Sequence, residues 1–381
     1  MGDALLSRRG ILAALASLPA LGAFPAVAAA RPVVVTTAKL AAGGFGIVGI
    51  DADGQASFVE PLPDRGHGVV PRPGGDDVAV VARRPGRFGY VVAGDTGAVR
   101  AELDLPDTRH YYGHAAYSAD GRLLYTTENA FDEDRGVLGV WDAAAGYARV
   151  GEIDSAGIGP HEVRRAADDG SLWVANGGIL THPDSGRIKL NLPTMQPTLA
   201  RVAPDGTAAE RVLVLPEELH KLSMRHVATH RESVAVAMQY EGPEGDIVPL
   251  IALTSTQGTT TQGTATQGTA PRLLDLPEVL ALRSRQYTGD VAFDPSGSVV
   301  GAGLPRGGFF AFWAAEDGRF LGSVEAPDGC AIAKGREAGG FVISTGIARI
   351  GHVSAGPNGV AVRWTRAPEV AAFDNHLMAA P

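Results

Sequence analysis

The chain has 381 residues, of which 45% are apolar, and it carries a formal net charge of −9. The absence of any lysine- or arginine-rich run argues against nucleic acid as a partner, and the one cysteine, Cys330, excludes an internal disulfide. Beyond the N-terminal region, no apolar stretch approaches the roughly 18 residues of a membrane span.

The N-terminal segment has the features of an export signal. Ser7-Arg8-Arg9-Gly10 contains twin arginines, and an alanine- and leucine-rich stretch leads to the small residues Ala28-Ala29-Ala30. This pattern predicts a twin-arginine (Tat) signal peptide over residues 1–30 and a periplasmic mature protein. A signal for the general Sec route is the alternative, and both routes place the mature chain outside the cytoplasm.

The mature chain, residues 31–381, repeats a unit of short β-like runs. Units begin at residues 67, 114, 161, 226, 290 and 330. Two units are longer than the others because they contain a polar insertion at 181–197 and a low-complexity Thr-Gln-Gly run at 256–269, which we expect to form a loop. Without these insertions the period is about 40 to 50 residues, the range of four-stranded propeller blades.

Each unit contains four predicted strands. In the second unit they cover 114–118, 123–127, 137–141 and 148–153, with an Asp120-Gly121 turn suited to a hairpin. The seventh unit is split: its first strand is predicted at 375–378, and the other three at 33–37, 46–50 and 56–59. A blade shared by both termini leaves no long open edge. The sequence therefore predicts an all-β fold, a single seven-bladed β-propeller, rather than an array of two-sheet sandwiches.

A metal-capable side chain stands at the start of every unit. The seven residues are His67, His114, His161, His226, Asp290, Cys330 and His376. Because the first strand of a blade lines the central channel, we expect them to meet at one channel mouth. Neutral imidazole binds zinc, copper and iron, so the pattern predicts a transition-metal site. It does not distinguish among Fe, Cu and Zn. Cys330 has a second interpretation as a small buried apolar residue.

The loops between the second and third strands of the units are expected to face the same mouth. They contribute Arg84, Glu128, Asn176 and Arg306 as polar residues of the channel face. The insertion at 181–197 falls on this side as well, where it can act as a lid. Polar side chains gathered at one end of a rigid scaffold are typical of a binding site.

Several runs in the middle of the chain resemble a known family. They cover residues 113–114, 121–129, 157–162, 174–179, 181–183, 189–192 and 222–226. The chain is similar over nearly its whole mature length to the bacterial domain of unknown function 1513 family. The resemblance implies a Tat-exported periplasmic propeller, often encoded beside imelysin-type and di-haem cytochrome-like proteins in iron-responsive clusters. It implies no established catalytic activity. The Thr-Gln-Gly run departs from the common pattern and affects only a loop.

Three functions are compatible with these features. The first is a periplasmic metal-binding protein of iron or copper acquisition. The second is a metal-dependent oxidoreductase in which Arg84, Glu128 and Arg306 orient a small anionic substrate. The third is a non-catalytic scaffold that docks a co-encoded imelysin-type or cytochrome-like partner. The sequence has no Ser-His-Asp spacing, phosphate-binding loop or CxxCH haem attachment, so no catalytic residue is assigned.

Overall fold

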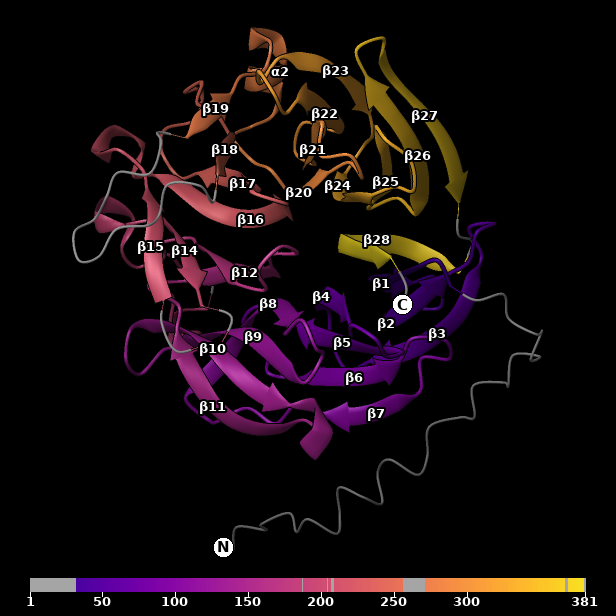
Figure 1. Cartoon of the computed structure of the whole chain (residues 1–381), viewed down its shortest axis with the longest axis vertical. Helices are drawn as coiled ribbons and strands as arrows, with labels where there is room; N and C mark the ends of the chain where they lie inside the picture. The colour runs from indigo at the N-terminus through magenta and orange to yellow at the C-terminus, as the bar shows by residue number, and fades with distance from the viewer. Residues whose placement is uncertain are drawn as a thin grey trace, which may run out of the picture. The chain divides into compact units, whose positions relative to one another are not determined.

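The computed structural model describes residues 32–186, 188–203, 205–206, 209–255, 271–366 and 369–379. Within them, strands β1 to β28 form seven sheets of four antiparallel strands. Each innermost strand lies beside the innermost strand of the next sheet, so the seven sheets form a ring of blades (Figure 1). The protein is therefore a seven-bladed β-propeller, as the sequence predicts.

Six blades follow one another along the chain, each numbered from its innermost strand outward. They are β4 (Gly66–Pro71), β5 (Asp77–Ala82), β6 (Gly89–Ala93) and β7 (Val99–Glu102); β8 (Arg109–Tyr117), β9 (Leu123–Ala130), β10 (Arg135–Asp142) and β11 (Ala148–Asp154); β12 (Pro160–Arg165), β13 (Leu172–Asn176), β14 (Thr198–Val202) and β15 (Ala209–Val214); β16 (Leu222–His230), β17 (Ser233–Tyr240), β18 (Ile251–Ser255) and β19 (Arg272–Leu274); β20 (Asp290–Phe293), β21 (Val299–Leu304), β22 (Phe309–Ala314) and β23 (Phe320–Glu325); β24 (Gly329–Lys334), β25 (Gly340–Thr345), β26 (Arg349–Gly356) and β27 (Gly359–Arg366). The short helical segments are α2 (Glu278–Arg283) and the 3₁₀ turns η2 (Ala143–Ala145), η3 (Pro183–Ser185), η4 (Leu192–Thr194) and η5 (Glu217–Leu219).

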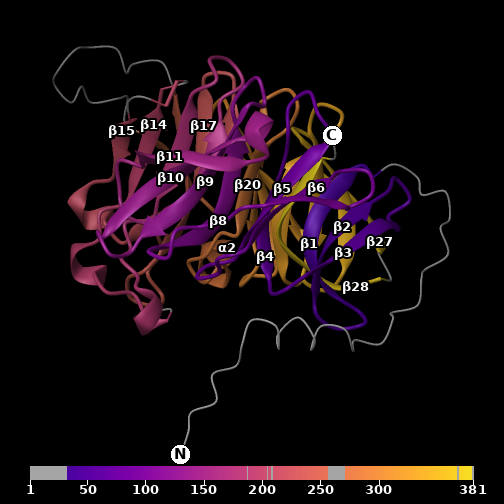
Figure 2. The same ribbon diagram turned by 90° about the horizontal axis from the view of Figure 1, so that it is seen from below.

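The seventh blade joins the two ends of the described chain. Its strands are β28 (Val370–Ala379), β1 (Val34–Leu40), β2 (Phe45–Ile50) and β3 (Ala56–Leu62), in that order from the channel outward. Leu377 pairs with Thr36 in the antiparallel register of β28 and β1. The two strands lie side by side in both views of the protein (Figure 1 and Figure 2). The split blade is thus confirmed, with an inner strand that begins earlier than predicted.

Burial explains why the inner and outer strands differ in composition. Strand β5 reads Asp-Val-Ala-Val-Val-Ala and is buried throughout, whereas β7, at the edge of the same blade, is mostly exposed. Inner strands are covered on both faces by neighbouring blades, so they need continuous apolar runs. The apolar clusters accordingly lie between blades; one of them joins Val81 of β5, Tyr117 of β8 and Trp141 of β10. This packing makes the channel wall a rigid scaffold.

The two insertions lie in different positions of their blades. The insertion at 181–197 connects β13 to β14, the second and third strands of its blade. The Thr-Gln-Gly run at 256–269 falls between β18 and β19, the third and fourth strands, and lies outside the described residues, as does the predicted signal peptide at 1–30. No helix in the described part of the chain is long and apolar enough to cross a membrane.

Candidate metal centre

The five predicted histidines lie where the innermost strands are irregular. The pairing register shifts around His67 on β4, His114 on β8, His161 on β12, His226 on β16 and His376 on β28. Such β-bulges bend a strand and re-aim its side chains. The same irregularity in five blades therefore turns five imidazoles toward one place.

The five imidazole rings form one compact cluster. Their ring centroids lie 4.4 Å apart for His114 and His376, 4.7 Å for His226 and His376, and 6.1 Å for His67 and His161. Four of the rings are buried and His161 is partly buried. The convergence expected from the repeat is thus present in the structure.

Gly113 lets the strands of this cluster approach each other closely. It has φ +117°, and a Cβ atom at this position would lie 2.4 Å from Cδ2 of His67. Non-glycine residues rarely adopt this conformation, and the space for a side chain is already taken by the neighbouring imidazole. Glycine before His114 is therefore required by both the backbone and the packing.

Three groups of side chains in the described residues have the spacing of metal ligands. Each group holds three ligand atoms within 4.8 Å of one another. The groups are His67, His114 and His376; His114, His161 and His226; and His226, Asp290 and His376. His114, His226 and His376 each belong to two groups, so these three histidines form the centre of the cluster.

Asp290 and Cys330, the two non-histidine residues of the predicted ring, differ in their surroundings. Asp290 is 2% exposed and its Oδ2 lies 3.2 Å from Nδ1 of His376. Cys330 is also buried, but it belongs to none of the three groups found among the described residues. Burial raises the pKa of the Cys330 thiol well above its usual range. Because Cys330 is buried and belongs to no group with metal-ligand spacing, the structure favours its apolar interpretation.

Buried carboxylates lie against the Nδ1 atoms of the histidines. Glu162 Oε2 is 3.0 Å from Nδ1 of His226, and its Oε1 is 3.6 Å from Nδ1 of His114. Asp374 Oδ1 lies 3.5 Å from Nδ1 of His67. A carboxylate in this position fixes the orientation of an imidazole and raises its basicity toward a metal bound at Nε2. Nε2 of His114 has no hydrogen-bond partner in the described part of the chain.

Burial also sets the charge states of the cluster. It lowers the pKa of His67 to about 3 and the pKa values of His114 and His161 well below the usual range. Burial opposes ionisation of Glu162, but Arg164 and His226 hold the pKa of this carboxyl down to about 2. At neutral pH the imidazoles of His67, His114 and His161 are therefore neutral, the form that binds metals, and the carboxylate of Glu162 nearby is charged.

Four residues of the site, all close in sequence to the predicted histidines, were not predicted from the sequence. Glu162 directly follows His161, Arg225 directly precedes His226, and Arg65 and Asp374 each stand two residues before a ring histidine. Arg65 donates to Asp374 through its guanidinium, and the bond from Nη2 measures 3.2 Å. Their proximity to the repeated histidines is the signal that would have identified them.

A cavity of about 790 Å³ opens over the histidine cluster. His67, His161, His226 and Cys330 belong to its wall. As predicted, loops between second and third strands also line it, contributing Arg84, Arg306 and, from the 181–197 insertion, Lys189. The cavity therefore gives a small molecule access to the cluster.

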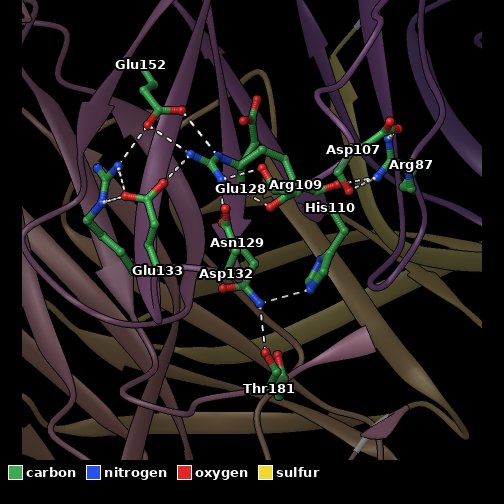
Figure 3. A network of polar contacts seen from close by, with 12 residues as sticks. Arg87, Asp107, Arg109, His110, Glu128, Asn129, Asp132, Glu133, Glu152 and Thr181 are labelled. Carbon is green, nitrogen blue, oxygen red and sulfur yellow. Dashed lines mark hydrogen bonds and ion pairs between the residues drawn. The ribbon is translucent and has the colours of Figure 1, made fainter. Parts of the chain in front are cut away.

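Glu128 and Asn176 do not line this cavity, so their expected position on the channel face is corrected. Glu128 is fully buried, accepts a hydrogen bond of 2.6 Å from Thr126 and forms an ion pair with Arg149. Figure 3 shows it in the polar network of its blade. Asn176 is buried as well, and its Nδ2 donates to the carbonyl oxygen of Ser155 at 2.8 Å. Both side chains satisfy polar groups inside the blades, because a buried polar group needs a partner.

Solved structures similar to this chain show the same fold at low sequence identity. The periplasmic gluconolactonase of Pseudomonas aeruginosa is 13% identical, with a TM-score of 0.58 over 91% of this chain and 100% of that chain. Hydrazine synthase of Kuenenia stuttgartiensis is also 13% identical, with the same TM-score and coverage. The computationally designed Ika8 protein is 12% identical, with a TM-score of 0.53 over 90% of this chain and 91% of that chain. At these identities the likeness concerns the fold alone.

A search of curated proteins gives no match. The profile of a family described as protein of unknown function (DUF1513) matches residues 60–380, and the chain therefore belongs to that family.

Proposed function

We propose that the protein binds one transition-metal ion in the histidine cluster and serves in the acquisition or handling of iron or copper outside the cytoplasm. The observation that carries the proposal is the convergence of five imidazoles from five blades, held by carboxylates at Nδ1. Such a carboxylate–histidine arrangement is typical of metal sites.

The alternative that these histidines only fill the channel has an energetic cost. Nε2 of His114 and Nε2 of His376 are buried without a hydrogen-bond partner among the residues that the structure describes. A buried polar atom without a partner costs about 1–3 kcal/mol. An ion coordinated by these nitrogens would remove that cost, which supports a metal site over a purely structural cluster.

His114, His226 and His376 are the central ligands in this proposal. Every pair among them shares one of the three ligand groups. His67, His161 or Asp290 would complete the coordination. Imidazole with carboxylate suits zinc, copper and iron, and intrinsic affinity among divalent ions favours copper. Which metal is bound in the cell then depends on supply as much as on the site.

Metal titration of metal-free protein tests this function. We expect one equivalent of Cu²⁺, Zn²⁺ or Fe²⁺ to bind, measured by competition with a chromophoric chelator and by elemental analysis. The double variant His114→Ala/His226→Ala should lose at least about 100-fold in affinity, since it removes two ligands. His220→Ala, outside the cluster, is the control, and circular dichroism checks that each variant folds. Wild-type protein that retains no metal, together with equal affinity in the double variant, would refute the proposal.

An oxidoreductase that uses this metal is the second candidate function, favoured by the cavity over the cluster. It requires a redox-active ion, so spectra of the copper- or iron-loaded protein should change on reduction. Spectra that do not change would contradict it.

Export and a partner complete the proposal. The twin-arginine segment predicts a periplasmic location, which cell fractionation tests. Docking of an imelysin-type or cytochrome-like protein stays a prediction, which a pull-down with the co-encoded proteins tests.

A further inference from the structure

The cavity over the histidine cluster is lined by more cationic than acidic side chains. The cations are Lys39, Arg65, Arg83, Arg84, Lys189, Arg225 and Arg306, and the acids are Asp328 and Asp374. The chain as a whole has a formal charge of −9. The cavity therefore has the opposite sign to the protein that surrounds it, which concentrates anions at this point.

Ion pairs within the protein neutralise only part of this charge. Arg65 pairs with Asp374, and Lys189 and Arg225 share Glu241. Nε of Arg225 is buried and has no hydrogen-bond partner among the described residues. Within the described part of the chain, Arg83 and Arg306 form no ion pair. A ligand with negative charge would supply the missing partners.

Aromatic side chains hold two of the arginines in place. The guanidinium of Arg306 lies 4.6 Å from the ring centroid of Tyr287, and that of Arg84 lies 5.6 Å from the ring centroid of Tyr112. A stacked guanidinium keeps its N–H edges available for hydrogen bonds in its own plane. These arginines are therefore preorganised to bind a planar oxyanion.

We propose that this cavity binds a small organic anion with two or more carboxylate groups. Guanidinium groups bind carboxylates through paired hydrogen bonds, and several arginines surround one space. The volume of about 790 Å³ lies within the range of small-molecule sites. Phe45, Phe373 and Pro305 also line the cavity and fit a carbon skeleton. Inorganic phosphate would use neither the volume nor these apolar walls.

The position of the anion links it to the histidine cluster. His67, His161 and His226 line the same cavity as the arginines. A polycarboxylate bound there can present one carboxylate to the ion while the arginines hold the others. This link rests on the proposed metal function, but recognition of the anion by the arginines does not.

Calorimetric titration of metal-free protein with citrate tests the proposal. We expect citrate to bind and acetate to bind at least about 100-fold more weakly, because each lost charged hydrogen bond costs roughly tenfold in affinity. Citrate affinity should fall as ionic strength rises. No binding of citrate, or binding of inorganic phosphate as tight as that of citrate, would overturn the proposal.

Single substitutions then identify the residues responsible. Arg83→Gln and Arg306→Gln should each weaken citrate binding by about tenfold. Arg122→Gln is the matched control, because Arg122 has 68% of its side chain exposed and does not line the cavity. Equal citrate affinity in the wild type and both cavity variants would overturn the assignment. Metal affinity should stay unchanged in both variants. Citrate binding is measured on metal-free protein, so it does not depend on the metal proposal, and the failure of one proposal can be distinguished from the failure of the other.

Discussion

The carboxylate of Asp290 lies 3.2 Å from Nδ1 of His376, and each residue is only 2% exposed. Asp290 begins β20 in the fifth blade, whereas His376 belongs to β28 in the blade that joins the two ends of the chain. Similar contacts join Glu162 to His226 and Asp374 to His67. The channel thus contains histidines that are oriented by carboxylates, which leads to the following predictions.

Replacing Glu162 by glutamine should lower metal affinity by roughly 10- to 100-fold. The amide keeps the size of the side chain but loses the charge beside Nδ1 of His226 and His114. Competition with a chelator measures the effect. Glu325→Gln is the control, since Glu325 pairs with Arg283 on the surface with 69% of its side chain exposed. Unchanged affinity in Glu162→Gln would contradict the role of the carboxylate.

Acidification should destabilise the metal-free protein. Burial lowers the pKa of His67 from 6.5 to about 3, so the unfolded state binds more protons than the folded state between these values. The contribution of His67 to the free energy of unfolding is fully present above pH 6.5 and is lost as the pH falls toward 3. The lowered pKa of Glu162 acts in the same direction below pH 4.5.

Thermal unfolding at pH 7 and pH 5 measures this effect. Between pH 7 and pH 5, protonation of His67 in the unfolded state should lower the free energy of unfolding by about 2 kcal/mol. His67→Gln should therefore show a smaller drop in midpoint than the wild type, whereas His220→Gln, at the partly exposed His220, should show the wild-type drop. A midpoint in the wild type that does not change between pH 7 and pH 5 would contradict the prediction.

Cys330→Ala should leave metal affinity nearly unchanged, within about twofold, because Cys330 belongs to none of the groups with metal-ligand spacing among the described residues. The folded wild type should also react slowly with thiol reagents and rapidly once unfolded. A marked loss of affinity in Cys330→Ala would return Cys330 to the ligand set.

Gly113→Ala should lower both stability and metal affinity. The positive φ costs about 1–3 kcal/mol for alanine, and the new Cβ would displace His67. Gly146→Ala is the matched control: Gly146 also has a positive φ, +65°, but a Cβ there would meet nothing within 4 Å. Chemical unfolding should show a lower free energy of unfolding in both variants. Metal titration should show a lower metal affinity in Gly113→Ala alone. Equal behaviour of the two variants would contradict the role of close packing at His67.

The sequence by itself determined the number of blades, the split seventh blade and the convergence of the five histidines. A repeat with a fixed phase places equivalent residues at equivalent points of a closed ring, so no side-chain detail was needed. The two loops that bring Arg84 and Arg306 to the cavity followed from the same argument.

Only the tertiary structure decided which side chains surround the histidines. A strand exposes alternate residues to opposite sides, and a bulge changes that alternation locally. Glu162 therefore reaches His226 across a blade boundary. Glu128 and Asn176, whose strands pair without a register shift with the next strand outward, stay inside their blades. Spacing along the chain determines where a residue enters the ring, but local register determines the direction of its side chain. The buried carboxylates and the cationic cavity depend on that direction, and for this reason the sequence alone did not reveal them.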